Sequence, residues 1–300
     1  MSKQQRVDLD AELRQPHSVP TSVPELRAWF VELMATMSVP TGVRQEETVL
    51  GGRPALSVTS ETGGPAGTIL YFHGGSFVFG SPGTAIGLTA SLVIRTGVRA
   101  LSLDYRLAPE HPFPAAVEDC VSAYRELLAG GIDPSTIAFA GDSAGGGLAI
   151  TTCLASRAAG LPMPAAIVAF SPGLDATRTG ASLQTKAGID PIFTREQLVG
   201  TGSLYLAGQD PRQELLSPAV IGDLTGLPPM LLQVGTNELL LDDATRMAER
   251  ARAVEVDVIL DVVAGVPHVF QAYAGRLDEA DEALDRAALF LSQRLRKPVA

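Results

Sequence analysis

Short apolar runs recur along most of the chain and alternate with segments whose apolar residues have helical spacing. The runs, rich in β-branched and aromatic residues, lie at Thr68–Phe72, Arg99–Tyr105, Thr136–Ala140, Ala165–Ser171, Met230–Gly235 and Asp257–Val263. The helical candidates lie at Pro114–Ala129, Ala144–Ala159, Asp242–Ala253 and from about Asp278 to Arg296. Strands that are apolar throughout and separated by helices are typical of a mostly parallel sheet with helices on both faces.

Two further β-like runs precede this alternation. Thr48–Leu50 and Ala55–Thr59 are separated by the turn signal Gly51-Gly52, so they are predicted to pair as an antiparallel hairpin. With the hairpin included, the pattern predicts about eight strands. We therefore expect an α/β fold built on one mostly parallel sheet that is flanked by helices.

Two segments fall outside the alternation. Between Ser22 and Met37 the apolar side chains recur on one helix face, and Ser22-Val-Pro-Glu25 is a capping box that predicts where this helix begins. Residues 175–226, rich in Gly, Thr, Pro and Gln, form a longer segment than a core connection needs. We expect an N-terminal cap region at residues 1–45 and a cap insertion at about residues 175–226 within a catalytic domain at residues 46–300.

The segment Gly141-Asp142-Ser143-Ala144-Gly145 matches G-x-S-x-G between a predicted strand and a predicted helix. Such a turn is too tight for side chains at the two glycines. It exposes the serine hydroxyl at a helix N-terminus, whose N–H groups stabilise developing negative charge. The motif alone would also suit a glycine-rich turn, but its strand–turn–helix setting favours Ser143 as a nucleophile.

A second glycine-rich segment, His73-Gly74-Gly75-Ser76, directly follows another predicted strand. Acyl transfer passes through a tetrahedral oxyanion, and catalysis needs preorganised donors where that charge develops. Because glycines let the backbone approach a substrate closely, the N–H groups of Gly74, Gly75 and Ala144 are predicted to form an oxyanion hole. The position of His73 before the glycines favours a role in bracing the loop over direct proton transfer.

A serine nucleophile requires a base, and the chain has four histidines, His17, His73, His111 and His268. The order Ser, acid, His that accompanies this motif selects His268, because the other three precede Ser143. The acid should follow a strand between these two residues. Glu238 lies nearest to the end of such a strand, while Asp175 and Asp242 remain alternatives.

These segments, together with the stretch Leu103–Ala116, resemble the bacterial hormone-sensitive-lipase-like family of α/β-hydrolases over about residues 48–273. The resemblance implies the α/β-hydrolase fold with a helical cap. It also implies a serine carboxylesterase that acts on short- to medium-chain esters and needs no cofactor and no metal. Family members of this kind often dimerise through the last strand of the sheet, so the resemblance implies a possible homodimer through Asp257–Val263.

Residue by residue, the resemblance places the nucleophile on Ser143, the base on His268 and the oxyanion glycines on Gly74 and Gly75. The sequence departs from the family pattern at two positions. Ser76 stands where the family has a third glycine, and Glu238 stands where the family usually has Asp. Glutamate is one methylene longer, so its contact with the histidine requires a slightly retracted backbone.

The expected reaction is attack of the serine on an ester carbonyl, followed by hydrolysis of the acyl-enzyme. A lactone hydrolase and an amidase or peptidase would use the same triad and remain alternatives. A non-catalytic ligand-binding protein is disfavoured because both the nucleophile and the base are present. The substrate pocket is expected to include Trp29, Phe30, Met34 and Asp142.

Composition narrows the range of partners. Hydrophobic residues make up 46% of the 300 residues and charged residues 19%, which excludes a mostly unstructured chain. The 33 acidic and 23 basic residues give a net charge of −10, which disfavours nucleic acid and anionic lipid surfaces as partners. A small-molecule ester is therefore the expected substrate.

The sequence also predicts a compartment. Cys120 and Cys153 are too few for a disulfide framework, and the first residues lack the apolar core of a signal peptide. No run approaches the roughly 18 apolar residues that a membrane-spanning helix needs. We therefore expect a cytoplasmic protein without stable membrane insertion.

Overall fold

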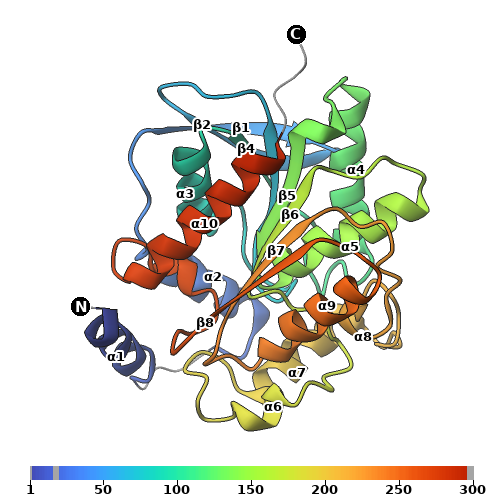
Figure 1. The fold of residues 1–300 in the computed structure, drawn as a ribbon. Helices are drawn as coiled ribbons and strands as arrows, with labels where there is room; N and C mark the ends of the chain where they lie inside the picture. The colour runs from blue at the N-terminus through green and yellow to red at the C-terminus, as the bar shows by residue number, and fades with distance from the viewer. Residues whose placement is uncertain (1, 16–19, 296–300) are drawn as a thin grey trace.

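The computed structural model describes residues 2–15 and 20–295. Within these residues the chain forms one sheet of eight strands in the order β1-β2-β4-β3-β5-β6-β7-β8. The strands are β1 (Val43–Leu50), β2 (Arg53–Ser60), β3 (Thr68–Phe72), β4 (Arg99–Leu103), β5 (Ile137–Asp142), β6 (Ala166–Phe170), β7 (Met230–Gly235) and β8 (Val258–Val263). The pairs β1–β2 and β2–β4 are antiparallel, and all other pairs are parallel. The predicted α/β fold with a mostly parallel eight-stranded sheet is confirmed (Figure 1).

The β1–β2 hairpin turns at the two glycines that the sequence indicates. Leu50 and Arg53 are register partners, so Gly51 and Gly52 form a two-residue loop, with φ of +62° and +75°. Loops of this kind need positive φ at both central residues, which glycine adopts without steric cost. A Cβ on Gly51 would also lie 2.4 Å from the backbone nitrogen of Ala123, so packing requires glycine there as well.

Helices cover both faces of the sheet (Figure 1). One face is covered by α3 (Ile86–Thr96) and α10 (Asp278–Arg294), the other by α4 (Ala115–Ala129), α5 (Ala144–Ala158) and α9 (Leu241–Ala253). In the central strand β3, Ile69 and Tyr71 join the core under α3 and α10, while Leu70 and Phe72 join the core on the opposite face. All four side chains are fully buried, which explains why the central strands show no polar alternation.

Outside residues 175–226, two helices of the described chain lie where the sequence pattern predicts none. Helix α1 (Ser2–Leu13) is mostly polar and buries only Leu9, so it carries no apolar stripe to detect. Helix α3 reads IGLTASLVIRT, a nearly continuous apolar run whose period does not separate helix from strand. Helix α10 ends at Arg294, and both the predicted helix end at Arg296 and His17 lie outside the described residues.

Two distant parts of the chain, which we call the cap, lie beyond the carboxyl ends of the parallel strands. They are α2 (Val23–Met34) and the segment 175–226, which contains α6 (Ser182–Thr185), α7 (Arg195–Leu206) and α8 (Pro218–Ile221). Figure 1 shows α6 and α7 at the bottom of the molecule, below the sheet. Helix α2 begins at the predicted capping box, where the Ser22 hydroxyl accepts from the Glu25 N–H, and ends before the predicted Met37.

Arg27 connects α2 to the sheet domain. The Arg27 guanidinium donates to the carbonyl oxygens of Val78 and Ala108, at 2.9 and 3.0 Å, and pairs with Glu110 at 2.6 Å. These contacts fix the position of α2 although none of its residues is fully buried. In the part of the chain that the structure describes, no helix combines the length and the apolar character needed to cross a membrane.

Candidate active site

Ser143 occupies the turn between β5 and α5, with φ +54° and ψ −119°. This backbone conformation is sparsely populated by non-glycine residues and costs on the order of 1–3 kcal/mol. Close approach of the backbone fixes the turn. A Cβ on Gly141 would lie 2.4 Å from the carbonyl oxygen of Gly145, and one on Gly145 would lie 2.0 Å from that of Phe72. Both glycines of the motif are therefore required, and Ser143 stands at the head of α5 as the motif predicts.

Three side chains from separate loops form a continuous line of hydrogen bonds. The Ser143 hydroxyl donates to His268 Nε2 at 2.9 Å, and His268 Nδ1 donates to Glu238 Oε2 at 2.9 Å. Glu238 is 0% exposed and His268 is 5% exposed, so bulk water does not compete for these bonds. The structure therefore brings together the nucleophile, the base and the acid that the sequence favours.

Glu238 controls the protonation of His268. Burial by itself lowers the pKa of His268, but the hydrogen bond to Glu238 and the charge of that carboxylate outweigh burial, so the pKa is raised above its usual 6.5. The charges of Asp190 and Asp142 act in the same direction. The imidazolium that forms during catalysis is accordingly stabilised in this site.

Ser171, which no sequence motif indicates, braces the acid. Its hydroxyl donates to Glu238 Oε1 at 2.8 Å and accepts from the Val269 N–H at 2.9 Å. The N–H of Gly235 donates to the same carboxylate oxygen. Both oxygens of Glu238 therefore have partners, which fixes the carboxylate in the orientation that meets His268. The one feature of the sequence that indicates Ser171 is its position directly after β6, at the edge of the sheet where parallel strands end.

The two alternative acids lie elsewhere. Asp175 pairs with Arg246 at 2.9 Å and accepts from two nearby threonines. Asp242 accepts from the Ser182 N–H at 3.0 Å and so connects α9 to the cap. Of the three carboxylates that the sequence offers, the geometry selects Glu238. Within the described residues no cluster of His, Cys, Asp and Glu is suited to hold a metal ion.

His73 braces the glycine-rich loop, as the sequence predicts. Its Nδ1 donates to the Gly74 carbonyl oxygen at 2.8 Å, and its ring stacks on Tyr105 with 4.1 Å between centroids. Burial lowers the pKa of His73 to about 4, so the ring is neutral at pH 7. A neutral, stacked imidazole holds the loop and takes no part in the hydrogen bond between Ser143 and His268.

The structure corrects the prediction for Gly74. Its N–H donates to Asp142 Oδ1 at 3.1 Å, and the Tyr71 hydroxyl donates to the same oxygen at 2.8 Å. A Cβ on Gly74 would lie 2.2 Å from Asp142 Oδ2, so only glycine allows this approach. With its proton donated to Asp142, this amide is not available to an oxyanion. Gly74 instead holds the loop against the turn that carries Ser143.

Three other amides beside the nucleophile have no acceptor. Within the described residues, the N–H groups of Gly75, Ser76 and Ala144 donate to no protein atom. Ala144 begins α5, and the first amides of a helix have no intrahelical acceptor. Gly75 and Ser76 both have positive φ, +119° and +53°, and lie with Ser143 around one cavity. These amides form a concave set of donors at the reacting hydroxyl.

Comparison with known proteins agrees with this geometry. A protein-family model described as the alpha/beta hydrolase fold matches residues 69–272. An acetyl-hydrolase of Streptomyces hygroscopicus is 45% identical over 75% of this chain and 75% of its own length. An esterase of Acinetobacter venetianus is 37% identical over 74% of this chain and 73% of its own. The crystal structure of an esterase from the bacterial hormone-sensitive lipase family matches with a TM-score of 0.93 and 39% identity, covering 98% of this chain and 99% of that one.

The chain belongs to the bacterial hormone-sensitive-lipase-like family of α/β-hydrolases. The resemblance that the motifs indicate is thereby confirmed. In this α/β-hydrolase, Ser76 takes the place of the family's third glycine and adopts the positive φ that glycine would adopt freely. The substitution therefore places a hydroxyl side chain beside Ser143, where Ser76 lines the site.

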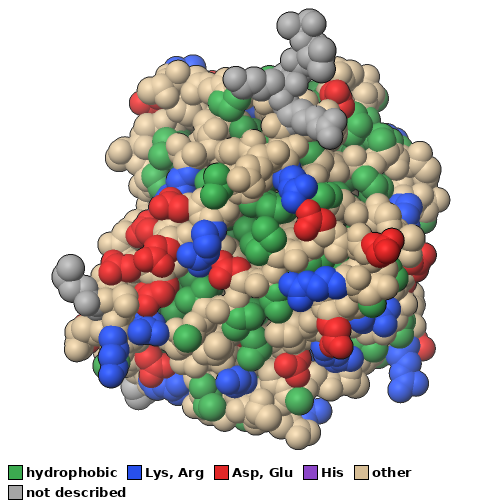
Figure 2. Space-filling view, in the orientation of Figure 1, with side chains coloured by type: hydrophobic (Ala, Val, Ile, Leu, Met, Phe, Trp, Pro, Cys, Tyr) green, Lys and Arg blue, Asp and Glu red, His purple; other side chains and the backbone are tan. Residues whose placement is uncertain are grey.

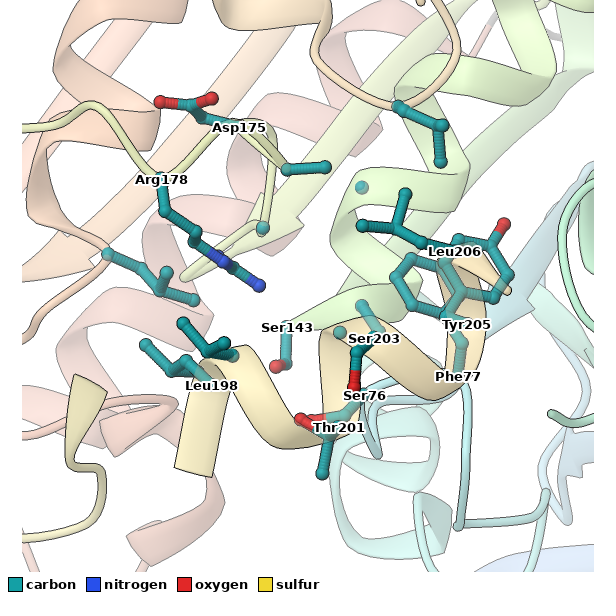
Figure 3. Close-up of a pocket in the computed structure, with 18 of the residues that line it drawn as sticks. Ser76, Phe77, Ser143, Asp175, Arg178, Leu198, Thr201, Ser203, Tyr205 and Leu206 are labelled. Carbon is teal, nitrogen blue, oxygen red and sulfur yellow. The ribbon is translucent and has the colours of Figure 1, made fainter. Parts of the chain in front are cut away.

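Two cavities meet at Ser143 in this α/β-hydrolase. The first lies against α2 and includes His268. The second lies between α5, α7 and residues 173–178, and Figure 3 shows its lining. Phe30, Met34 and Asp142 line the first cavity, as predicted, whereas Trp29 lines neither cavity in the described part of the chain. Consecutive helix residues point about 100° apart, so the face that presents Phe30 to the cavity turns Trp29 away.

Proposed function

We propose that this α/β-hydrolase is a serine carboxylesterase that hydrolyses short- to medium-chain carboxylic esters through an acyl-enzyme. The proposal rests on the unbroken line from Ser143 through His268 to Glu238, in which both hydrogen bonds are 2.9 Å long. Relatives that are named esterases support the ester as the substrate class. The three side chains supply nucleophile, base and acid, so the reaction needs neither a cofactor nor a metal.

In the proposed reaction His268 Nε2 takes the proton of Ser143 as its Oγ attacks the ester carbonyl carbon. Glu238 holds the imidazole in the tautomer that exposes Nε2 and stabilises the cation that forms. The imidazolium then protonates the leaving alcohol, and the acyl group stays on Ser143. Water repeats the sequence on the acyl-enzyme, which releases the carboxylic acid and restores the serine.

The proposed oxyanion hole consists of the amides of Gly75, Ser76 and Ala144. All three lack protein acceptors within the described residues, whereas the Gly74 amide is committed to Asp142. Preorganised amides that point at the developing oxyanion contribute strongly, with a loss of about 10²–10³ in kcat for one missing donor in a comparable site.

The two cavities receive the two halves of the ester. His268 must protonate the leaving oxygen, so the cavity that includes His268 is proposed to hold the alcohol. The other cavity contains Ser143 but not His268, so it is proposed to hold the acyl chain. We refer to them as the alcohol cavity and the acyl cavity. The cap, which is α2 with residues 175–226, supplies walls to both, and we propose that it acts as the substrate-binding part of a single catalytic domain.

A serine variant tests the proposal directly. Ser143→Ala should abolish hydrolysis of 4-nitrophenyl butyrate, followed by release of 4-nitrophenol, while the circular dichroism spectrum stays unchanged. Ser292→Ala on the exposed face of α10 is the matched control and should keep full activity. Undiminished turnover by Ser143→Ala would refute the mechanism. A higher kcat/KM for the matched amide, 4-nitrobutyranilide, would assign the site to amides instead.

We also propose a homodimer through the free edge of β8. This strand pairs on one side with β7, and Ile259 and Val262 on it are 47% and 42% exposed. Figure 2 shows hydrophobic side chains along the middle of the face on which β8 lies. Light scattering after gel filtration should give twice the chain mass of 31.4 kDa. Ile259→Lys should give monomers and Ile221→Lys on α8 should not; a monomeric wild type would refute the dimer.

The cytoplasm is the compartment that we propose for this protein. Cys120 and Cys153 are both buried and unpaired, which suits a reducing environment. Fractionation of the native cells, followed by immunoblotting, would test this, and recovery from the medium or the periplasm would refute it.

A further inference from the structure

We infer that the acyl cavity contains a subsite for a negatively charged group on the acyl chain, and that Arg178 is its specificity-determining residue. The preferred substrates would be monoesters of short dicarboxylic acids, in which the acyl chain ends in a carboxylate. The inference rests on the proposed esterase function, and it concerns the substrate class of that same site.

Arg178 enters the acyl cavity from the cap. It lies in the segment that follows β6 and lines the same cavity as Ser143. Figure 3 shows its side chain extending into the cavity toward the Ser143 hydroxyl, above Leu198. The backbone of Arg178 has φ +54°. Arginine in that region is strained, so the surrounding loop imposes this backbone conformation.

The guanidinium of Arg178 has no partner of its own. Among the described residues, no carboxylate lies within ion-pair distance of it and no acceptor takes a hydrogen bond from it. The other charged side chain in the cavity, Asp175, is already paired with Arg246 at 2.9 Å. Asp243 attracts Arg178 through space, but its carboxylate accepts from the amides of Leu174 and Asp175. The guanidinium of Arg178 therefore keeps its hydrogen-bond donors free for a ligand, although the charge of Asp243 attracts it through space.

Most of the remaining lining is apolar. Leucine and aromatic side chains dominate it: Phe77, Leu198, Tyr205, Leu206, Leu215 and Leu216. Two hydroxyls in the cavity already donate within α7, Thr201 to the Gln197 carbonyl and Ser203 to the Gly200 carbonyl. An unpaired cation in a largely apolar cavity loses solvation unless a ligand supplies negative charge. A carboxylate fits this need best, because the planar guanidinium can donate two parallel hydrogen bonds to it.

The chemistry at Ser143 is unchanged by this assignment. Water cleaves the monoester to the free dicarboxylate and the alcohol, with one proton released. Arg178 contributes by orienting the acyl chain so that the ester carbonyl lies at Ser143 while the distal carboxylate is held in the cavity. The effect of Arg178 on kcat/KM should therefore depend on whether the acyl chain carries a charge. It should depend little on the alcohol.

The experiment compares two esters with the same alcohol and the same acyl length, monoethyl glutarate and ethyl pentanoate. Ethanol release is measured with a coupled dehydrogenase at about 0.15 M salt, where charges beyond about 8 Å are screened. The wild type should favour the monoester in kcat/KM by about tenfold, the effect of one charge-assisted bond of roughly 1.4 kcal/mol. The same comparison of monoethyl succinate with ethyl butyrate, and of monoethyl adipate with ethyl hexanoate, identifies the preferred acyl length.

Arg178→Met keeps an unbranched side chain, although a shorter one, and removes its charge. It should lower kcat/KM for the monoester about tenfold and change that for ethyl pentanoate less than threefold, because only the charged contact is lost. Arg178→Lys should recover part of the preference. Arg195→Met, at the exposed start of α7 and outside the cavity, changes the net charge equally and should leave both values unchanged.

The following outcomes would refute the proposed subsite. Equal loss on both esters in Arg178→Met would show a structural role, and an unchanged ratio would show that the charge is not used. The wild-type ratio is a second test that needs no variant: a preference for the neutral ester at every chain length refutes the subsite. In all these cases the wild type still hydrolyses esters, whereas failure on every ester, with 4-nitrophenyl butyrate included, would refute the proposed function itself.

Discussion

At the scale of single residues, Glu238 acts on His268 through charge as well as through orientation. The carboxylate raises the pKa of His268 against the effect of burial. Glu238→Gln removes that charge, so the pKa of His268 should fall and the acid limb of the kcat/KM–pH profile should move to lower pH. The plateau should fall about 10³-fold or more, because the amide can also select the wrong imidazole tautomer.

The pH profile with 4-nitrophenyl butyrate measures both effects of Glu238→Gln. Glu249→Gln, an exposed substitution on α9, is the matched control and should leave the profile in place. A plateau near the wild-type value, or an acid limb that stays where it is, would move the acid role away from Glu238.

A substitution at Ser171 tests the same carboxylate through the oxygen that does not contact His268. Ser171→Ala removes a donor to Glu238 Oε1 and an acceptor for the Val269 N–H. The carboxylate then keeps more of its charge for the imidazole, so the pKa of His268 should rise and the acid limb should move to higher pH. We expect kcat to fall about tenfold, the value of one buried hydrogen bond to a charged group.

The direction of the shift separates this role from a structural one. Ser171→Ala and Glu238→Gln should move the acid limb in opposite directions, as measured by the same pH profiles. Ser156 is also a fully buried serine, and Ser156→Ala should leave the acid limb at its wild-type position. A Ser171→Ala variant whose acid limb coincides with that of the wild type would show that Ser171 does not act through Glu238.

These residues differ in how well the sequence reveals them. Ser143 and His268 could be predicted, because a local motif and the order along the chain identify them. Ser171 could not, because its role depends on which strand end lies beside Glu238 in space. The oxyanion hole in the glycine-rich loop stays a prediction, and its donor at Gly74 is replaced, since a sequence does not show that Asp142 accepts from that amide.

At the scale of elements, the cap is bonded to the loop that carries the acid. Asp190 in the cap accepts from the Leu239 N–H at 2.8 Å, and from the amides of Ile192 and Phe193. The Phe193 ring in turn packs edge-on against His268, with 5.0 Å between centroids. The cap therefore contacts both the acid loop and the base of the triad.

Asp190→Asn tests this connection between the cap and the acid loop. The amide of asparagine places an N–H₂ group against one of the backbone donors, so one buried hydrogen bond is lost. We expect the free energy of unfolding to fall by about 1–3 kcal/mol, as measured by urea denaturation. Asp210→Asn on the exposed surface of the cap should change it little. An equal fall in the free energy of unfolding in both variants would show that the hydrogen bond between Asp190 and Leu239 does not stabilise the fold.

The elements themselves were predictable where burial leaves a pattern in the sequence. The central strands are buried on both faces and read as short apolar runs, and α2 shows a capping box and an apolar face. Helix α7 buries only Leu198 and Tyr205, so its pattern is too weak to reveal it. The sequence therefore predicts the insertion at 175–226 as a departure from the alternation without predicting the helices inside it.

At the scale of the whole molecule, the site combines parts of the chain that lie far apart. Ser143, Ser171 and Glu238 follow β5, β6 and β7, which are neighbours in the sheet. Parallel strands end at one edge, so residues after each strand gather there. This explains why the fold class and the triad are predictable from the alternation and the motifs together. The cavities also depend on where the cap rests, which no local pattern encodes.

The stability of the whole fold should depend on pH through Asp243. This side chain is 3% exposed, and its Oδ2 accepts from the amides of Leu174 and Asp175 at 2.7 and 3.0 Å. Burial raises the pKa of Asp243 from its usual 3.8 to about 7. Between these two values the folded state holds a proton that the unfolded state has released. Stability is therefore fully present below about pH 3.8 and is lost as pH rises toward 7.

Asp243→Asn isolates this contribution, because asparagine keeps an oxygen for both amides and cannot ionise. We compare the free energy of unfolding of the variant with that of the wild type. This difference should favour the variant more at pH 8 than at pH 5, by on the order of 1–4 kcal/mol. Urea denaturation at the two pH values measures the difference, and Asp210→Asn should show no such change. A gap between wild type and variant that is the same at both pH values would mean that Asp243 is ionised in the folded protein throughout. In that case the attraction of Asp243 for the guanidinium of Arg178 would be at full strength across the pH range in which the enzyme works.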